Sequence, residues 1–253
     1  FVWEGKNGNQ RIFKKELAQN IGKKLKAQKI TVKKVERKEK KTYAPELYDL
    51  TALQKEASKR YGFSPKQTLN LMQSLYEHHK ILTYPRTDSR YLTSDMTDTL
   101  KDRIRASSVG PYKKTTALLL RKDIKGSGRF VNDKKVSDHH AIIPTEQSVR
   151  LTEMSADERK IYDMVVRRFL AVLMDPSVSE QIQIQGEISG EHLRARAVLQ
   201  KKAGWKDAYE EQEQEENMIT HLPELPEGGR QYVCGSPVIT EGETKAPGRY
   251  TEG

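Results

Sequence analysis

Residues 155–184, S-A-D-E-R-K-I-Y-D-M-V-V-R-R-F-L-A-V-L-M-D-P-S-V-S-E-Q-I-Q-I, contain the point at which the hydrophobic period of the chain changes. In the first part apolar residues recur every third or fourth position, as in a helix with one buried face. Ser155 and Glu158 have the spacing of a capping box at the start of that helix. Pro176 ends it, because proline cannot donate a backbone hydrogen bond. Beyond Pro176 isoleucine alternates with glutamine, which is typical of a strand.

The sequence upstream of this stretch also predicts helices. Thr51–Tyr61 ends at Gly62, a favourable residue just past a helix end. S-P-K-Q, beginning at Ser64, has the form of a capping box with proline at the first helical position. A further helix is expected over Thr93–Ala106, whereas Ser107–Gly128 is less regular. The buried stripe of the helix that begins after Ser64 is expected to comprise Leu69, Met72, Leu75 and Tyr76.

Strands are expected on both sides of this helical block. A basic helix over Arg11–Ala27 precedes a strand at Lys29–Val35, which the polar stretch Glu36–Tyr43 is expected to break. After the block, residues 193–199 alternate apolar and polar, and Tyr232–Ile239 predicts another strand. The fold class is therefore α+β, with a helical domain near 48–178 inserted into a β-rich body.

The charge is concentrated in one segment. The chain has 45 Lys and Arg against 35 Asp and Glu, and residues 1–41 hold 14 of the former and 4 of the latter. Nucleic acid is one natural partner for such a segment, and a solvated lysine-rich surface is the alternative. The acidic stretch Asp207–Glu216 predicts a solvated loop, or a spacer that repels DNA. A single cysteine, Cys234, excludes an internal disulfide and any zinc site of several cysteines, which favours an intracellular protein.

The stretch with the most reactive side chains is I-L-T-Y-P-R-T-D-S-R-Y-L at residues 81–92. A phenol is ionised to only about one part in a thousand at neutral pH, and a neighbouring guanidinium favours the phenolate and binds phosphate. Tyr84 beside Arg86 therefore suggests attack of a tyrosine oxygen on a phosphodiester, with the bond energy conserved for rejoining. The alternative is a structural turn in which Arg86 pairs with Asp88.

A second stretch, S-D-H-H-A-I-I-P-T, occupies residues 137–145. Adjacent histidines lack the i, i+4 spacing of paired zinc ligands on a helix, so no metal site is predicted. His139 or His140 could present an imidazolium to a phosphate, and a structural histidine is the alternative. The pair His78-His79 predicts a polar helix end.

Together these stretches resemble the type IA DNA topoisomerases, and bacterial topoisomerase III most of all. The resemblance rests on L-T-A-L-Q-K-E-A, F-S-P-K-Q-T-L and Y-P-R-T-D-S-R-Y-L, followed 55 residues after the tyrosine by H-H-A-I-I-P-T, and on T-K-A-P-G-R-Y-T-E-G at 244–253. It implies that Tyr84 is the nucleophile that forms a 5′-phosphotyrosine, and that Arg86 and His139 contact the scissile phosphate. Asp88 would hold Arg86 or the loop in place. DNA contacts are implied for Thr83, Ser89, Arg90, Arg167 (with Arg168 as the neighbouring alternative) and Arg249.

The resemblance also implies the central part of a toroidal enzyme, in which a winged-helix, CAP-like helical domain carries the tyrosine and a β-rich arch opens a DNA gate. The family's Mg²⁺-binding Toprim domain should carry D-x-D, and no D-x-D occurs in this sequence. We therefore expect an internal fragment that cannot relax DNA alone, with Mg²⁺ bound elsewhere in the parent enzyme. The expected domains are 1–47 plus 179–240 as the arch, 48–178 as the helical domain, and 241–253 as the start of the next DNA-binding domain.

The implied partners are single-stranded or underwound DNA and the Toprim and DNA-binding domains of the same chain. The expected protein is a monomer without membrane association, in the cytoplasm at the bacterial nucleoid, and it acts without ATP in relaxation or decatenation. A tyrosine recombinase or type IB enzyme would place its histidine and arginine before the tyrosine, and the order here is the reverse. The alternative from another class is a non-catalytic basic nucleic-acid-binding module.

Overall fold

The computed structural model describes residues 1–5, 7–209, 218–219, 231–233 and 235–247. The chain divides into two compact units. Unit 1 comprises residues 1–41, 178–202 and 213–247, and unit 2 comprises residues 42–177, 203–212 and 248–253. The functional domain boundaries given above stay predictions.

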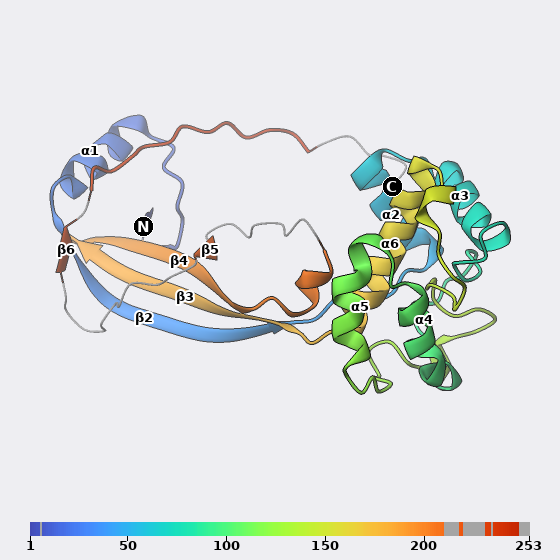
Figure 1. Ribbon diagram of the computed structural model, residues 1–253. Coiled ribbons are helices and arrows are strands. Elements are labelled where there is room, and N and C mark those ends of the chain that lie inside the picture. Colours follow the sequence, from blue (N-terminus) through green and yellow to red (C-terminus); the bar gives the residue numbers. More distant parts are fainter. Residues whose placement is uncertain (6, 210–217, 220–230, 234, 248–253) are drawn as a thin grey trace. The chain divides into compact units, whose positions relative to one another are not determined.

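Unit 1 is built on a mostly antiparallel sheet in which the long strands curve together (Figure 1). Within the described residues the strand order is β1-β4-β3-β2-β6, and β5 pairs with β4 in parallel. The strands are β1 (Val2–Glu4), β2 (Lys29–Thr42), β3 (Ser177–Ile188), β4 (Glu191–Lys202), β5 (Met218–Ile219) and β6 (Gln231–Val233).

The predicted alternation after Pro176 is confirmed by a hairpin of β3 and β4. Ile184 pairs with Ala195, and the isoleucines of β3 are buried while its glutamines are half-buried. Ser189 and Gly190 form the turn with φ of 47° and 81°. Positive φ at both positions is what a two-residue type I′ turn requires, and its twist matches that of the strands.

Two expectations for the basic segment need correction. The strand that begins at Lys29 does not stop at Val35 but continues to Thr42. The long strand β3 lies beside β2 and offers partners to its backbone groups, whereas β6 pairs only with Lys29–Thr31. The charged side chains of β2 are exposed to water. The basic helix is shorter than expected: α1 (Lys15–Leu25) places Ile21 and Leu25 against the sheet residues Ile30, Ile188 and Leu193.

Unit 2 is helical, and its helix ends follow the predicted capping residues. The helices are α2 (Leu50–Tyr61), α3 (Pro65–Glu77), α4 (Leu100–Ala106), α5 (Lys113–Leu120) and α6 (Ala156–Leu173). Gly62 follows α2 with φ of 69°, the Ser64 hydroxyl accepts a hydrogen bond from the backbone amide of Gln67, and Ser155 and Glu158 form both bonds of a capping box. The core of the unit surrounds α6, whose Ile161, Val165 and Phe169 are buried.

Three helical predictions differ from the structure. Residues Ser94–Thr99 form a 3-10 helix before α4, and the Thr97 and Thr99 hydroxyls in it donate to carbonyls three residues earlier, a local bond that competes with the regular helical pattern. The irregular stretch after Ser107 contains α5. Tyr76, expected in the buried stripe of α3, is 37% exposed, while its neighbours Met72 and Leu75 are fully buried.

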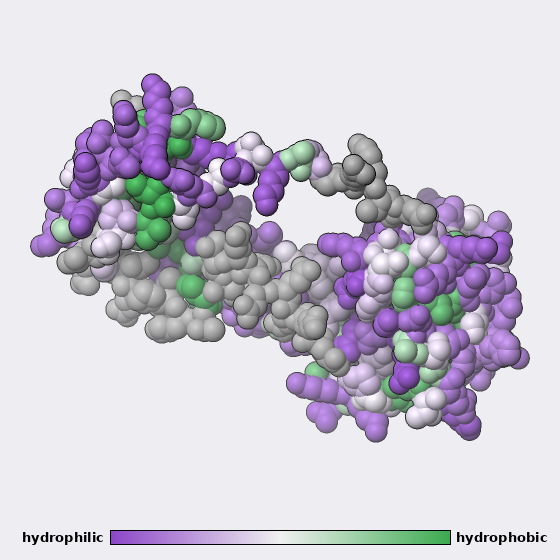
Figure 2. Space-filling model, turned by 90° about the horizontal axis from the view of Figure 1, so that it is seen from above, coloured by the Kyte–Doolittle hydropathy of each residue, from purple (hydrophilic) through white to green (hydrophobic). Residues whose placement is uncertain are grey.

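The surface is largely hydrophilic in the view of Figure 2, in keeping with a chain that is 32% charged. Among the helices of the described residues, none combines the length and apolar composition that a membrane crossing requires.

Candidate active site

The tyrosine loop and the histidine stretch lie side by side in unit 2. Leu82 forms an antiparallel bridge with Pro144. The backbone amide of Thr83 donates to the carbonyl of Ile143 at 3.0 Å, and the amide of Ile143 donates to the Thr83 hydroxyl at 3.0 Å. The two motifs therefore form one short piece of paired backbone, although they are far apart in sequence.

This pairing brings the side chains of Tyr84 and His139 together. Their ring centroids are 4.3 Å apart with an interplanar angle of 39°. Tyr84 is half-buried and His139 is exposed. His140 instead turns inward: its Nδ1 lies 2.7 Å from the carbonyl oxygen of Ala141, and burial lowers the pKa of its imidazole. Of the two adjacent histidines, the exposed one is therefore the one beside the tyrosine.

Three hydroxyl side chains hold the loop in shape. The Thr87 hydroxyl donates to the carbonyl of His139 at 2.9 Å and accepts from the amide of Ser89 at 3.0 Å. The Ser89 hydroxyl donates to the carbonyl of Lys135 at 2.8 Å, and the Thr83 hydroxyl to that of Ala141 at 3.3 Å. All three side chains are buried. These hydroxyls are used within the protein, and the DNA contacts expected of Thr83 and Ser89 stay predictions.

The guanidinium of Arg90 also bonds to other residues of the protein. Its Nε donates to Asp49 at 2.7 Å and its Nη1 to Glu46 at 3.2 Å. The hydrogen bond that Arg90 donates to Asp49 is the main cause of the raised pKa of Arg90, against the effect of burial. Asp49 also caps α2 by accepting from the amide of Ala52 at 2.6 Å. Arg90 thus ties the loop to the start of α2, and the DNA contact expected of it stays a prediction.

Arg86 and Asp88 behave differently from these residues. Both side chains are exposed, and neither has an ion pair or hydrogen bond to any residue that the structure describes. The expected pairing of Arg86 with Asp88 is therefore absent from the described structure. The Arg86 guanidinium is free to meet an anion, two residues after the tyrosine.

The paired arginines of α6 lie inside unit 2. Arg167 donates to Asp163 at 2.7 Å and to the carbonyl of Ala208 at 2.8 Å. Arg168 donates to Tyr48 and Glu56 at 2.9 and 2.6 Å. Each arginine is 8% exposed and bonded within the protein, and the DNA contact expected of Arg167, or of Arg168 in its place, stays a prediction. The helical period of the sequence could not predict this burial, because charged side chains are expected on the outward face of a helix. Arg249 lies outside the described residues.

One aromatic neighbour of Tyr84 was missed as a site residue by the sequence reasoning. The ring of Tyr76, in the last turn of α3, meets Tyr84 edge-on with centroids 5.5 Å apart. Tyr76 lies eight residues before Tyr84, at the end of the helix that leads into the loop. This position was the sequence feature that could have identified it as a neighbour of Tyr84.

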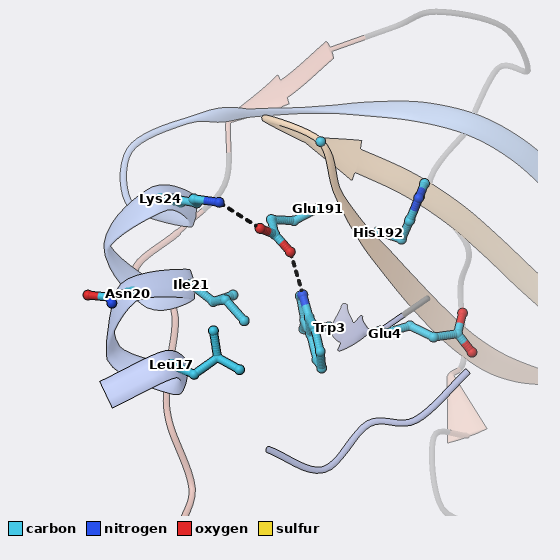
Figure 3. A pocket seen from close by; sticks show the side chains of 10 residues that line it. Trp3, Glu4, Leu17, Asn20, Ile21, Lys24, Glu191 and His192 are labelled. Carbon is cyan, nitrogen blue, oxygen red and sulfur yellow. Dashed lines mark hydrogen bonds and ion pairs between the residues drawn. The ribbon is translucent and has the colours of Figure 1, made fainter. Parts of the chain in front are cut away.

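A cavity of about 280 Å³ in unit 1 contains none of the predicted site residues (Figure 3). Trp3, Leu17 and Ile21 line it, and the Trp3 indole and Lys24 donate to Glu191 at 2.9 and 3.0 Å. These two donors hold the pKa of Glu191 below its ordinary value. Lys24 and Glu191 at this cavity are thus paired with each other, and Glu4, which also lines it, pairs with Arg194 at 3.0 Å.

Comparisons with known proteins agree on one family. A sequence model described as DNA topoisomerase matches residues 2–253. The chain is 46% identical to DNA topoisomerase 3 of Bacillus cereus over 99% of this chain and 35% of that protein. It is 43% identical to DNA topoisomerase 3 of Bacillus subtilis over 100% of this chain and 35% of that protein. The chain thus spans about a third of the length of these curated relatives.

A solved structure has a similar fold. Full-length topoisomerase I from Thermotoga maritima superimposes with a TM-score of 0.66 over 91% of this chain and 36% of that chain, at 22% identity.

Proposed function

This chain belongs to the DNA topoisomerase family, and from that premise we propose that it is the part of a type IA enzyme that carries the DNA-cleaving tyrosine. The observation that carries the proposal is the 4.3 Å separation of the Tyr84 and His139 rings. These rings come from the two motifs, 55 residues apart, on which the family resemblance rests. A structural turn would not need an exposed histidine and a free guanidinium beside its tyrosine.

In the proposed reaction the hydroxyl oxygen of Tyr84 attacks the phosphorus of a DNA phosphodiester. A P–O bond to tyrosine forms and the P–O3′ bond breaks, which leaves a 5′-phosphotyrosine and a free 3′-hydroxyl. The phenol proton goes to solvent, and the departing oxygen takes up a proton. One phosphodiester replaces another, so attack by the 3′-hydroxyl rejoins the strand without ATP.

Two cations would support this exchange. Arg86 offers a planar fork of N–H donors that matches two phosphate oxygens, and its exposed side chain has no partner to leave among the described residues. A protonated His139, whose ring packs against that of Tyr84, would offer a second donor to the phosphate. Phosphoryl transfer depends mainly on positioning and charge neutralisation, which these two side chains would supply.

The remaining features of the family belong to the same proposal. The substrate would be single-stranded or underwound DNA. The helical domain would be inserted into the β-rich arch, and the arch would lift that domain to open a gate through which DNA passes. Mg²⁺ would be held by a Toprim domain of a longer protein. The described residues contain no group of three or more His, Cys, Asp or Glu side chains that could hold a metal ion, and every step above uses only side chains of this chain. A monomer in the cytoplasm stays the prediction.

The test is covalent trapping with a longer protein that contains this chain. An oligonucleotide whose short upstream fragment, which ends in the free 3′-hydroxyl, dissociates after cleavage cannot be rejoined and should leave an adduct, and peptide sequencing should map it to Tyr84. Tyr84→Phe should abolish the adduct and retain DNA affinity. An adduct on another residue, or none, contradicts the proposal. If Tyr84→Phe leaves plasmid relaxation intact and changes only affinity, the non-catalytic module is favoured.

The proposed dependence on a Toprim domain has its own test. The 253-residue chain alone should leave negatively supercoiled plasmid unchanged over hours in the presence of Mg²⁺. Relaxation by the isolated chain would contradict this part of the proposal.

A further inference from the structure

The Tyr84 hydroxyl has no hydrogen bond to any residue that the structure describes. A nucleophile needs a free hydroxyl to meet its substrate, so its direction has to be set through other atoms of the side chain. The ring of Tyr84 has two aromatic neighbours. The His139 ring is tilted at 39° to the plane of the Tyr84 ring, and the Tyr76 ring is nearly perpendicular to it, at 80°.

Tyr76 is an unusual surface residue. It is 37% exposed, although Met72 and Leu75 of the same helix are fully buried, so it contributes little to the core of unit 2. Its specific contact is the edge-on packing against Tyr84, with centroids 5.5 Å apart. Such perpendicular pairs are favourable because the positive edge of one ring meets the negative face of the other.

The two neighbours of Tyr84 come from different parts of the chain. Tyr76 is on α3, and His139 is in the stretch that pairs with the tyrosine loop. Between α3 and the loop stands Lys80, with a left-handed φ of 58°, so the chain turns sharply before Tyr84. The helix end and the loop are thereby set at an angle that brings the rings of Tyr76 and Tyr84 together.

We propose that Tyr76 is a positioning residue for Tyr84, and that its ring restricts the Tyr84 phenol to the rotamer in which it packs against His139. The proposal rests on the proposed function of Tyr84. The contact uses the Tyr76 ring and not its hydroxyl, because that hydroxyl also lacks a hydrogen bond to any described residue. A phenylalanine at position 76 should therefore keep the Tyr84 phenol in this rotamer, and a leucine should not.

The test compares Tyr76→Phe and Tyr76→Leu in the full-length enzyme that carries this chain. Single-turnover formation of the covalent oligonucleotide adduct should be within about twofold of wild type for Tyr76→Phe, and about three- to tenfold slower for Tyr76→Leu, from the usual strength of such ring pairs. The dissociation constant for the oligonucleotide should not change. Tyr61→Leu is the matched control, since it removes a ring pair with the same 5.5 Å separation, between Tyr61 and Phe63, and should not change the rate.

A second measurement does not depend on activity. In the 253-residue chain with labelled tyrosine, NMR signals of the Tyr84 ring, assigned with Tyr84→Phe, should shift in Tyr76→Leu and show averaging between rotamers. They should keep close to wild-type shifts in Tyr61→Leu. This measurement also reports whether each variant is folded.

The outcomes separate the two proposals. If Tyr84→Phe still forms an adduct, the proposed function itself fails. If Tyr84→Phe forms none but Tyr76→Leu matches wild type in rate and in the Tyr84 signals, only the role of Tyr76 is overturned. Equal slowing by Tyr76→Phe and Tyr76→Leu would also overturn it, since that result would assign the effect to the hydroxyl.

Discussion

At the scale of single residues, arginine shows how similar side chains differ in role. Arg86 is exposed and without a partner among the described residues, whereas Arg90 bonds two carboxylates and Arg168 is buried. A free guanidinium can bind phosphate without first breaking an ion pair. A buried one contributes to stability instead, because its removal leaves its partners unpaired.

Arg86→Ala should slow covalent adduct formation by the longer protein by about 100-fold, the usual effect of removing one donor that stabilises a transition state. Arg86→Lys should recover only part of the rate, because a lysine lacks the bidentate fork. Thermal unfolding of both variants should match wild type, since the side chain is exposed. A wild-type rate for Arg86→Ala would contradict the role proposed for this residue.

Arg168→Met should reduce the free energy of unfolding of the 253-residue chain by about 3 kcal/mol, because Tyr48 and Glu56 would lose their buried cation. Urea denaturation at neutral pH measures this. The control is Arg196→Met, at an exposed position of β4 with no ion pair among the described residues, which should change stability by less than about 0.5 kcal/mol. Similar effects of the two substitutions would contradict the buried role of Arg168.

At the scale of elements, Glu158 links the start of α6 to the end of α3. Its carboxylate accepts from the backbone amide of Ser155 at 2.7 Å and from the Ser74 hydroxyl at 2.6 Å, and His79 lies 3.5 Å away. Burial alone would raise the pKa of Glu158, but the hydrogen bonds from Ser74 and Ser155, with His79 nearby, lower it to about 2. The ionised form is thus the one that joins the two helices.

The lowered pKa of Glu158 predicts a pH dependence of stability. The unfolded carboxyl has a pKa of about 4.5, so its stabilising effect is complete above that pH and is lost as the pH falls towards 2. Glu158→Gln should reduce the free energy of unfolding by roughly 1.5 kcal/mol at pH 7, as for hydrogen bonds to a charged group. Urea denaturation from pH 7 to pH 2 should show the two proteins converging. A constant difference across that range would contradict the assignment.

The ends of α2 and α3 give a matched pair of backbone predictions. Gly62 follows α2 and Lys80 follows α3, with φ of 69° and 58°. A side chain with a Cβ is strained in this region, so Gly62→Ala should destabilise the chain by about 1 kcal/mol and Lys80→Gly should stabilise it by up to about that amount. Thermal unfolding would show midpoints moving in opposite directions, and movement in the same direction would contradict the explanation.

At the scale of the whole molecule, the excess positive charge lies in residues 1–41, largely on α1 and β2. Lys33 and Lys34 have carboxylates beside them, at Glu187 and Glu36, whereas Arg37 and Lys38 are exposed without a partner among the described residues. Such cations on a strand surface can release counterions from a nucleic-acid backbone.

Replacing Lys33, Lys34, Arg37 and Lys38 by Gln should weaken binding of single-stranded oligonucleotides to the chain and reduce the slope of log affinity against log salt, by about 0.7 for each lost phosphate contact. Fluorescence anisotropy between 50 and 200 mM salt measures both quantities. The control replaces four exposed lysines of unit 2, Lys55, Lys59, Lys113 and Lys114, with the same change in net charge. If the two variants bind alike, the basic segment acts only through net charge or as a solvated surface.

The sequence by itself determined the local features: the capping boxes at Ser64 and Ser155, the helix end at Gly62, and the change of period at Pro176. Each depends on side chains that are neighbours along the chain, so local spacing was sufficient to predict them. The motif pair at Tyr84 and His139 also identified the family before any geometry was known.

Tertiary structure decided what depends on partners distant in sequence. The strand β2, which lies beside β3 in the sheet, continues to Thr42, and packing around α6 buried Arg167 and Arg168. The pairing of the tyrosine loop with the histidine stretch placed the His139 ring against that of Tyr84, turned His140 towards Ala141, and gave the hydroxyls of Thr83 and Ser89 partners within the protein. These outcomes could not be read from spacing, because burial and hydrogen-bond partners are set by which surfaces meet after the chain has closed its long loops.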